Sequence, residues 1–185
     1  MRIIAGAHRG RKLQGPPGET TRPTLGRARE ALFSILGAAL PGAMVLDAFA
    51  GSGALGLEAL SRGAAFCCFC EQDPAALGAL RANIAALRFE CSSGLCPGDF
   101  FLALPRFRRE SPRFSLAFLD PPYASGLLEP SLSALRDGIL APGALVVCEA
   151  ERGTALCLPP GFEQVTERVY GRNALWIYRL APQKA

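Results

Sequence analysis

The sequence contains little histidine and no long apolar run, and each absence excludes a class of function. His8 is the only histidine among the 185 residues, so a serine–histidine triad or an imidazole-bound metal would depend on this one side chain. No apolar run approaches the roughly eighteen residues of a membrane-spanning helix. The N-terminus passes from Met1 directly into basic residues, without the apolar core of a secretion signal. We therefore expect a cytoplasmic protein that makes no contact with membranes.

Cysteine is present, but its pattern does not indicate disulfides. The chain has seven cysteines, and an odd number without a secretion signal argues against a disulfide framework. Three of them, Cys67, Cys68 and Cys70, lie within one apolar run, where cysteine acts as a small buried hydrophobic residue. Because the chain has only one histidine as well, we expect no metal site.

Positive charge is concentrated near the N-terminus. The whole chain carries a net charge of +4. The first 29 residues alone carry +6, since their seven basic residues are opposed only by Glu19, which leaves −2 for the remainder. A basic segment on a slightly acidic body is expected of a protein that binds a polyanion. A solvated surface segment would show the same charge, so the charge alone leaves both interpretations open.

The rest of the chain alternates short apolar runs with helical patterns, which is typical of a doubly wound α/β fold. We expect a Rossmann-like sheet of seven mostly parallel strands in residues 25–185, preceded by a small basic hairpin or arm in residues 1–24. The predicted strands are 44–48, 65–70, a weak one within 90–96, 114–119, 144–148 and a final hairpin of 161–169 and 175–180. The predicted helices are 25–39, 54–61, 74–87 and 127–137.

The most informative stretch is the end of the predicted strand 114–119, which is followed by Asp120, Pro121, Pro122 and Tyr123. Two prolines cannot donate to a sheet, so the strand must end there. The strand thus delivers a carboxylate, backbone carbonyls and an aromatic ring to the carboxyl edge of the sheet, where open α/β sheets bind ligands. This set suits an exocyclic NH2, whose hydrogens the acceptors bind while the ring stacks on the flat group that carries it. An ordinary turn with an incidental aspartate is the alternative.

A glycine-rich segment joins the first predicted strand to the next helix. Gly51, Gly53 and Gly56 match the G-x-G-x-x-G spacing of dinucleotide sites, and Glu71 ends the second predicted strand twenty residues after Gly51. The glycines allow a cofactor to approach the backbone, and the carboxylate binds ribose hydroxyls. This pattern alone does not distinguish NAD from S-adenosylmethionine.

Further carboxylates favour S-adenosylmethionine. Asp47, at the end of the first predicted strand, suits the methionine part of a sulfonium cofactor and would repel a pyrophosphate. Asp99, after the third predicted strand, is placed to accept from the adenine amine, and Asp120 completes the set. A helix N-cap and a turn are the alternative roles of Asp47 and Asp99. The candidate cofactor-binding residues are Asp47, Phe49, Ala50, Gly51, Ser52, Gly53, Gly56, Glu71, Gln72, Asp99, Phe100 and Asp120.

These motifs resemble a known family. Asp120 to Tyr123 is similar to the motif of class I amino-methyltransferases, which act on base amines or a glutamine amide. The segments Arg22 to Thr24, Glu30 to Leu36, and Leu46 to Ala64 resemble the bacterial RsmD family, and the resemblance extends from Arg2 to Gly171. It departs from the family pattern at three positions, Gly26, Ser115 and Asn173.

The resemblance implies a class I fold, S-adenosylmethionine as cofactor, and transfer of a methyl group to the N2 amine of guanine 966 in 16S ribosomal RNA. It implies 16S RNA or the assembled 30S subunit as partner, and excludes DNA. Nothing in the sequence demands a dimer, so we expect a monomer. The catalytic candidates are Asp120, Pro121, Pro122 and Tyr123, and the candidate RNA contacts are Arg9, Arg11, Lys12, Arg22, Pro23, Thr24 and Arg27.

Four other functions compete with this interpretation. A DNA adenine or cytosine methyltransferase would carry a recognition insert, for which the chain has no room. A release-factor glutamine methyltransferase usually has Asn in place of Asp120. An NAD-dependent oxidoreductase needs a hydride-transfer acid, and His8 lies in the basic segment. A non-enzymatic RNA-binding module would have no need to keep Asp47, Glu71, Asp99 and Asp120 together.

Overall fold

The structure is a computed structural model that describes residues 1–16, 23–110, 113–122 and 125–181. The helices are α1 (Pro23–Leu36), α2 (Ala54–Ser61), α3 (Pro74–Leu87), α4 (Phe100–Glu110) and α5 (Leu128–Arg136), with short 3-10 turns at Gly37–Ala39 and Glu90–Ser92. The strands are β1 (Met44–Asp47), β2 (Phe66–Glu71), β3 (Ser93–Pro97), β4 (Phe114–Leu119), β5 (Leu140–Glu151), β6 (Phe162–Tyr170) and β7 (Asn173–Leu180).

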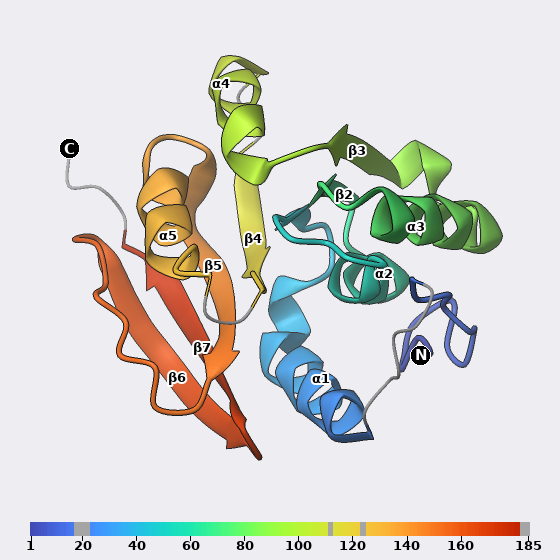
Figure 1. Cartoon of the computed structure of the whole chain (residues 1–185), viewed down its shortest axis with the longest axis horizontal. Helices are drawn as coiled ribbons and strands as arrows, with labels where there is room; N and C mark the ends of the chain where they lie inside the picture. Colours follow the sequence, from blue (N-terminus) through green and yellow to red (C-terminus); the bar gives the residue numbers. More distant parts are fainter. Residues whose placement is uncertain (17–22, 111–112, 123–124, 182–185) are drawn as a thin grey trace.

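All seven strands form one sheet in the order β3-β2-β1-β4-β5-β7-β6 (Figure 1). The first five strands pair in parallel, and β7 pairs antiparallel with β5 and β6. The first strand, β1, lies inside the sheet. The next two strands are added on one side of it, and the remaining four on the other side. This confirms the predicted seven-stranded, mostly parallel, doubly wound sheet. The reversal lies between β1 and β4, which is where such sheets bind ligands.

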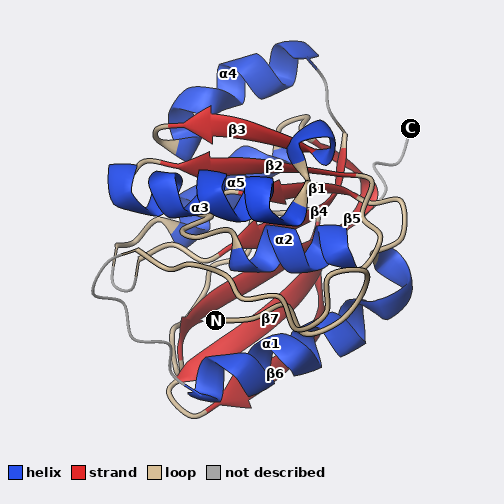
Figure 2. Ribbon diagram, turned by 90° about the vertical axis from the view of Figure 1, so that its right-hand side faces the viewer, coloured by secondary structure: helices blue, strands red, loops and turns tan. Residues whose placement is uncertain are grey.

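Helices cover both faces of the sheet (Figure 2). Successive residues of a strand point to opposite faces, so the central strands supply two separate cores. In β1, Val45 packs with the core under α1, α2 and α3, whereas Leu46 packs with the core under α4 and α5. In β2, Cys67 joins the first core and Cys70 the second. Although these two cysteines have the Cys-x-x-Cys spacing, they lie on opposite faces and cannot chelate one ion.

Helix α4 was not predicted. Phe100, Leu104 and Phe107 have helical spacing and are all buried, but Pro105 lies inside the helix and removes the donor that would bind the preceding turn. The helix forms because burial of the two aromatic rings and Leu104 outweighs that loss. The ring of Phe107 packs edge-on against Phe114 of β4, with centroids 5.5 Å apart. Among the helices in the described residues, none is long and apolar enough to span a bilayer.

The N-terminal segment, residues 1–16, folds back on itself and lies beside α2 and α3 (Figure 1). Arg2 and Lys12 form an antiparallel bridge. The buried carboxylate of Glu58 in α2 accepts from the Ile4 and Ala5 amides at 2.7 and 3.0 Å. Gly6 has a φ of +84°, and a Cβ there would lie 1.8 Å from the Ser61 carbonyl oxygen. The segment is therefore packed closely against the body of the protein, and the predicted boundary at residue 24 falls inside α1.

Candidate active site

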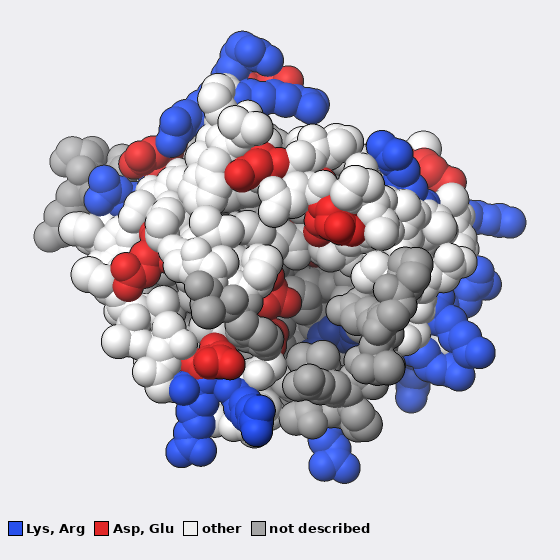
Figure 3. All heavy atoms as spheres, in the orientation of Figure 1, with Lys and Arg blue, Asp and Glu red and all other residues white. Residues whose placement is uncertain are grey.

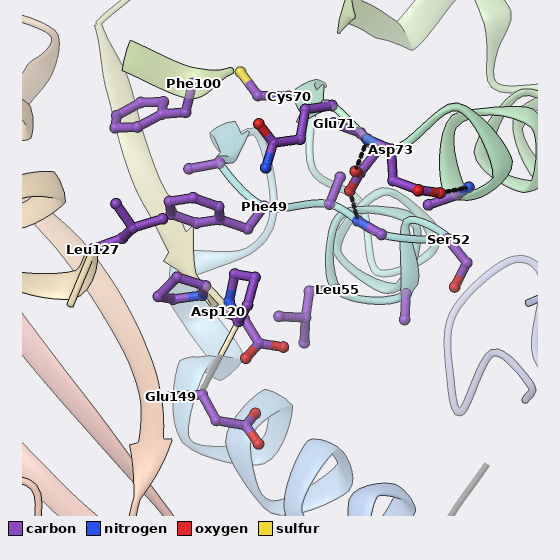
Figure 4. Close-up of a pocket in the computed structure, with 18 of the residues that line it drawn as sticks. Phe49, Ser52, Leu55, Cys70, Glu71, Asp73, Phe100, Asp120, Leu127 and Glu149 are labelled. Atoms are coloured by element: carbon purple, nitrogen blue, oxygen red, sulfur yellow. Dashed lines mark hydrogen bonds between the residues drawn. The ribbon is translucent and has the colours of Figure 1, made fainter. Parts of the chain in front are cut away.

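A cavity of about 530 Å³ opens at the carboxyl edge of the parallel strands, within the range of small-molecule sites. Its walls come from the loop after β1, the ends of β2 and β4, the turn after β3, and one residue each of β5 and β7 (Figure 4). Residues of the N-terminal segment and of α1, α2 and α3 complete them. The cavity therefore occupies the point where the strand order reverses. The predicted residues that line it are Phe49, Ala50, Gly51, Ser52, Glu71, Gln72, Asp99, Phe100, Asp120, Pro121 and Pro122.

The three glycines of the β1–α2 loop have different functions. Gly51 lines the cavity with a φ of +53°, and a Cβ there would point into open space. A side chain at this position would therefore occupy the room that a ligand needs. Gly56 is buried, and its Cβ would lie 2.3 Å from the Phe69 ring, so it allows α2 to approach β2 closely. Gly53 begins α2 in a left-handed conformation against Leu80. Only Gly51 of the three lines the cavity.

Asp47 lies behind the loop and is 2% exposed. Its carboxylate accepts from the Gly56 amide at 3.0 Å and so caps the first turn of α2. Burial raises the pKa of Asp47 to about 7, although the Gly56 hydrogen bond opposes this. Asp47 is not among the described residues that line the cavity. Its contact with a cofactor stays a prediction. The contacts show that its carboxylate binds an amide in the first turn of α2, whose N-cap residue is Gly53.

Glu71, at the end of β2, faces the cavity and is held by two backbone amides. It accepts from Gly51 at 2.6 Å and from Asp73 at 2.7 Å (Figure 4). In a dinucleotide site the amides of this loop would bind a pyrophosphate. Here the Gly51 amide already donates to the Glu71 carboxylate, and the Gly56 amide donates to the Asp47 carboxylate. The carboxylates therefore repel phosphate, and they suit a cation with ribose hydroxyls. The site fits S-adenosylmethionine and does not fit NAD.

Asp99 and the rings of Phe49 and Phe100 also line the cavity. The exposed Asp99 carboxylate accepts from the Phe101 amide at 2.8 Å and so caps the start of α4. The rings of Phe49 and Phe100 lie with centroids 5.9 Å apart, and Figure 4 shows both on one side of the cavity. A flat apolar group such as adenine can pack against this wall while a carboxylate nearby accepts from its amine.

Asp120 follows the last residue of β4 and its carboxylate points into the cavity (Figure 4). Pro121 is buried and Pro122 is exposed, and the Pro122 carbonyl accepts from Ser125 at 3.1 Å. The two prolines end the strand as predicted. Tyr123, the fourth residue of the motif, lies outside the described residues, so its stacking role stays a prediction.

The sequence analysis missed several residues that line the cavity. Glu149 on β5 is the most important, because it adds a second carboxylate on the strand next to Asp120. Its signal was available, since Glu149 directly follows the apolar run 144–148 just as Asp120 follows 114–119. The other cavity residues that sequence reasoning missed include Arg29, Leu32, Leu55, Cys70, Asp73, Leu127 and Leu175.

The candidate RNA contacts Arg9, Arg11, Lys12 and Arg27 are not among the residues that line the cavity. Arg9, Arg11 and Lys12 are exposed, and the Arg11 guanidinium donates to the Ala86 carbonyl of α3 at 2.9 Å. Figure 3 shows basic side chains along the right-hand edge, where Figure 1 places the N-terminal segment and α3. Arg27 is exposed on α1, whose first two residues are Pro23 and Thr24. Arg22 lies outside the described residues.

The strand order, the β1–α2 loop and the carboxylate-lined cavity define a class I S-adenosylmethionine-dependent methyltransferase. The chain belongs to the RsmD family, since the family model described as "Conserved hypothetical protein 95" matches residues 1–179.

Known proteins resemble this chain along nearly its whole length. It is 39% identical to "Ribosomal RNA small subunit methyltransferase D" of Escherichia coli K12, over 99% of this chain and 91% of that protein. It is 35% identical to the protein of that name from Haemophilus influenzae, over 97% and 93% of the two chains. The solved structure of the Escherichia coli protein yhhF matches with a TM-score of 0.86 and 38% identity, covering 99% of each chain.

Proposed function

We propose that this protein methylates the N2 amine of guanine 966 in 16S ribosomal RNA. The observation that carries the proposal is Asp120, followed by two prolines, at the wall of a cavity suited to S-adenosylmethionine. The names of the Escherichia coli and Haemophilus influenzae relatives support ribosomal RNA of the small subunit as substrate. The particular guanine follows from the resemblance of the motifs to the RsmD family.

The acceptors of the Asp120 motif position the amine. S-adenosylmethionine supplies a methyl group activated by a sulfonium. The Asp120 carboxylate and the Pro121 carbonyl accept the two amine hydrogens, which turns the nitrogen lone pair away from the ring and toward the methyl group. Asp120 does not need to remove a proton first, because the amine becomes acidic only as the new bond forms. The catalysis therefore rests mainly on positioning.

The target base reaches the cavity by leaving its RNA context, which costs a few kcal/mol of stacking. In this proposal Tyr123 stacks on the extruded base, and such stacking returns about 1–3 kcal/mol. The exposed Arg9, Arg11 and Lys12 bind phosphates beside the cavity. A chain with this little surface outside the catalytic fold reads its RNA by shape and backbone, and the assembled 30S subunit supplies such a shape.

The enzymatic alternatives differ mainly in substrate. A DNA amino-methyltransferase would use the same acceptors, whereas a glutamine-amide methyltransferase usually has Asn in place of Asp120. A non-enzymatic RNA-binding module would keep the basic surface without turnover. We further propose that the protein is a cytoplasmic monomer that acts on RNA and not on DNA.

Transfer of tritium from labelled S-adenosylmethionine tests the proposal. Unmethylated 30S particles, naked 16S RNA, duplex DNA and release factor are offered side by side, with the Asp120→Ala variant as control. We expect label on RNA, recovered as N2-methylguanosine after digestion, and loss of turnover in Asp120→Ala with cofactor affinity within a few-fold of wild type. Label on DNA or release factor would overturn the RNA assignment. Near-normal turnover of Asp120→Ala would overturn the role of Asp120.

A further inference from the structure

The cavity contains a second carboxylate beside Asp120, and its position is set by the pairing of β4 with β5. Leu119 is the register partner of Cys148, so the next residue of each strand, Asp120 and Glu149, come to the same edge side by side. Both line the cavity. Figure 4 shows the Glu149 carboxylate beyond that of Asp120, on the side of α1 and away from Phe49 and Phe100. Glu149 therefore lies outside the part of the cavity suited to the cofactor.

Glu149 is held in place from the neighbouring strand. The side-chain amide of Asn173 on β7 donates to its Oε1 atom at 2.6 Å. Glu149 itself pairs with Leu175, which also lines the cavity, and its side chain is only half-buried. The bond to Asn173 fixes the direction of the carboxylate. Each carboxylate oxygen has about two acceptor sites, so an oxygen that already holds one hydrogen bond still has room to accept from a ligand.

A guanine offers a donor at the place where this second carboxylate lies. On its Watson–Crick edge the N2 amine stands next to the N1–H group, and both are donors. If Asp120 accepts from the N2 amine, the neighbouring N1–H needs a second acceptor, which the protein must supply once the base has displaced water from the cavity. We propose that Glu149 accepts the N1–H of the target base and selects guanine. This inference rests on the proposed function, because it takes the N2 amine as the group held by Asp120.

The same geometry rejects the other bases that carry an exocyclic amine. In adenine and cytosine the ring nitrogen beside the amine is an acceptor without a proton. A carboxylate facing that nitrogen would bring two acceptors together, and both would lose their hydrogen bonds with water. Sites built to bind an N–H group discriminate strongly against analogues that lack it, because the polar group of the site is left unpaired. Glu149 thus separates a guanine-N2 from an adenine-N6 or cytosine-N4 enzyme, whereas Asp120 suits all three.

An RNA with 2-aminopurine in place of the target guanine tests the proposal. This base keeps the 2-amine but has an unprotonated N1, so the substitution removes the donor that Glu149 is proposed to bind. For the wild-type protein we expect kcat/KM to fall tenfold or more with the 2-aminopurine RNA. The Glu149→Gln variant can turn its amide NH2 toward the acceptor at N1. Its preference for guanine over 2-aminopurine should therefore shrink at least tenfold relative to wild type.

Comparing the two proteins on the same pair of RNAs cancels effects of the missing O6 atom and of general damage to the site. Glu151→Gln is the matched control, since it makes the same change on the same strand at an exposed residue that does not line the cavity. It should leave the preference unchanged. The fluorescence of 2-aminopurine gives a second readout, because Glu149→Gln should bind this RNA more tightly than wild type.

Asn173→Ala offers an independent variant, since it removes the Asn173 hydrogen bond from Oε1 of Glu149 without changing the carboxylate itself. It should weaken the preference for guanine partially, with a larger effect on the ratio of the two bases than on cofactor affinity. If Glu149→Gln lowers kcat/KM equally for both RNAs, or leaves the preference as in wild type, the base-selecting role is wrong while the methyltransferase assignment stands. If guanine-containing RNA receives no methyl group at all, the proposed function fails and this inference fails with it.

Discussion

Glu58 provides the strongest test of how the N-terminal segment is attached. Its side chain is fully buried in α2, with 0% exposure. Three donors converge on it: the Ile4 amide at 2.7 Å, the Ala5 amide at 3.0 Å and the Arg62 guanidinium at 2.7 Å. Replacement of this carboxylate by the Gln amide introduces a donor where only acceptors are useful, so at least one of the three donors loses its partner.

The expected cost follows from the burial of these groups. Leaving one member of a buried ion pair without its partner costs about 3–5 kcal/mol, and the Gln oxygen of the Glu58→Gln variant recovers one neutral hydrogen bond of about 1 kcal/mol. We therefore expect a loss of about 3 kcal/mol in the free energy of unfolding. This is a large share of the 5–15 kcal/mol that is typical of a domain.

Urea unfolding at pH 7 measures this loss, and Glu110→Gln supplies the matched control. Glu110 forms an i,i+4 pair with Arg106 at 3.0 Å, as Glu58 does with Arg62, but its side chain is 46% exposed. An exposed pair contributes only about 0.3–0.5 kcal/mol, so this variant should unfold almost as wild type does. Equal effects of the two substitutions would refute the reasoning. Amide hydrogen exchange at Ile4 and Ala5 should also accelerate in Glu58→Gln and not in the control.

Three further predictions concern the cofactor loop and the basic surface. Gly51→Ala should weaken S-adenosylmethionine binding in calorimetry, and its left-handed backbone conformation should cost about 1–2 kcal/mol of stability. Gly56→Ala, whose new Cβ clashes with the buried ring of β2, should mainly lower the urea midpoint. Because burial raises the pKa of Asp47 to about 7, the folded protein keeps a proton that the unfolded chain has released. The unfolding free energy should thus fall between pH 4 and pH 7, and Asp47→Asn should remove that slope. In titrations against salt, the double variant Arg11→Ala/Lys12→Ala should reduce the slope of log Kd for RNA by about 1.5; an unchanged slope would remove these residues from the RNA surface.

Much of the sheet could be predicted because local patterns and the fold agree. The bounds of α2, α3 and β4 match the sequence analysis, since apolar periodicity, a capping residue at Asp73 and the two prolines after Asp120 all act within a few residues. The positions of Asp120 and Glu71 at the sheet edge followed from the ends of these runs. Such features need no knowledge of distant contacts.

What the sequence could not provide depends on contacts between distant segments. Helix α4 contains Pro105 and forms because its apolar face meets β4. Asp47 ends a strand exactly as Glu71 does, and only the packing of α2 determines that one caps a helix while the other faces the cavity. Glu149 follows an apolar run as Asp120 does, but its position next to Asp120 depends on the register of β5 with β4 and β7. In each case the sequence supplied the residue and the tertiary structure supplied its role.

Asn83 explains why the basic segment and the cofactor cavity belong to one cooperative structure. This α3 residue is 1% exposed, and its amide NH2 donates to the carbonyls of Gln14 and Ser52, each at 2.9 Å. Its Oδ1 atom accepts from the Gln14 amide at 2.8 Å. Ser52 lies in the loop that lines the cavity, and Gln14 lies just after the basic residues Arg11 and Lys12. Because an unpaired buried amide is costly, movement of either segment breaks bonds that the other needs. The charge of Arg11 and Lys12 is therefore held at a fixed position relative to the cavity, as positioning an RNA base for reaction requires.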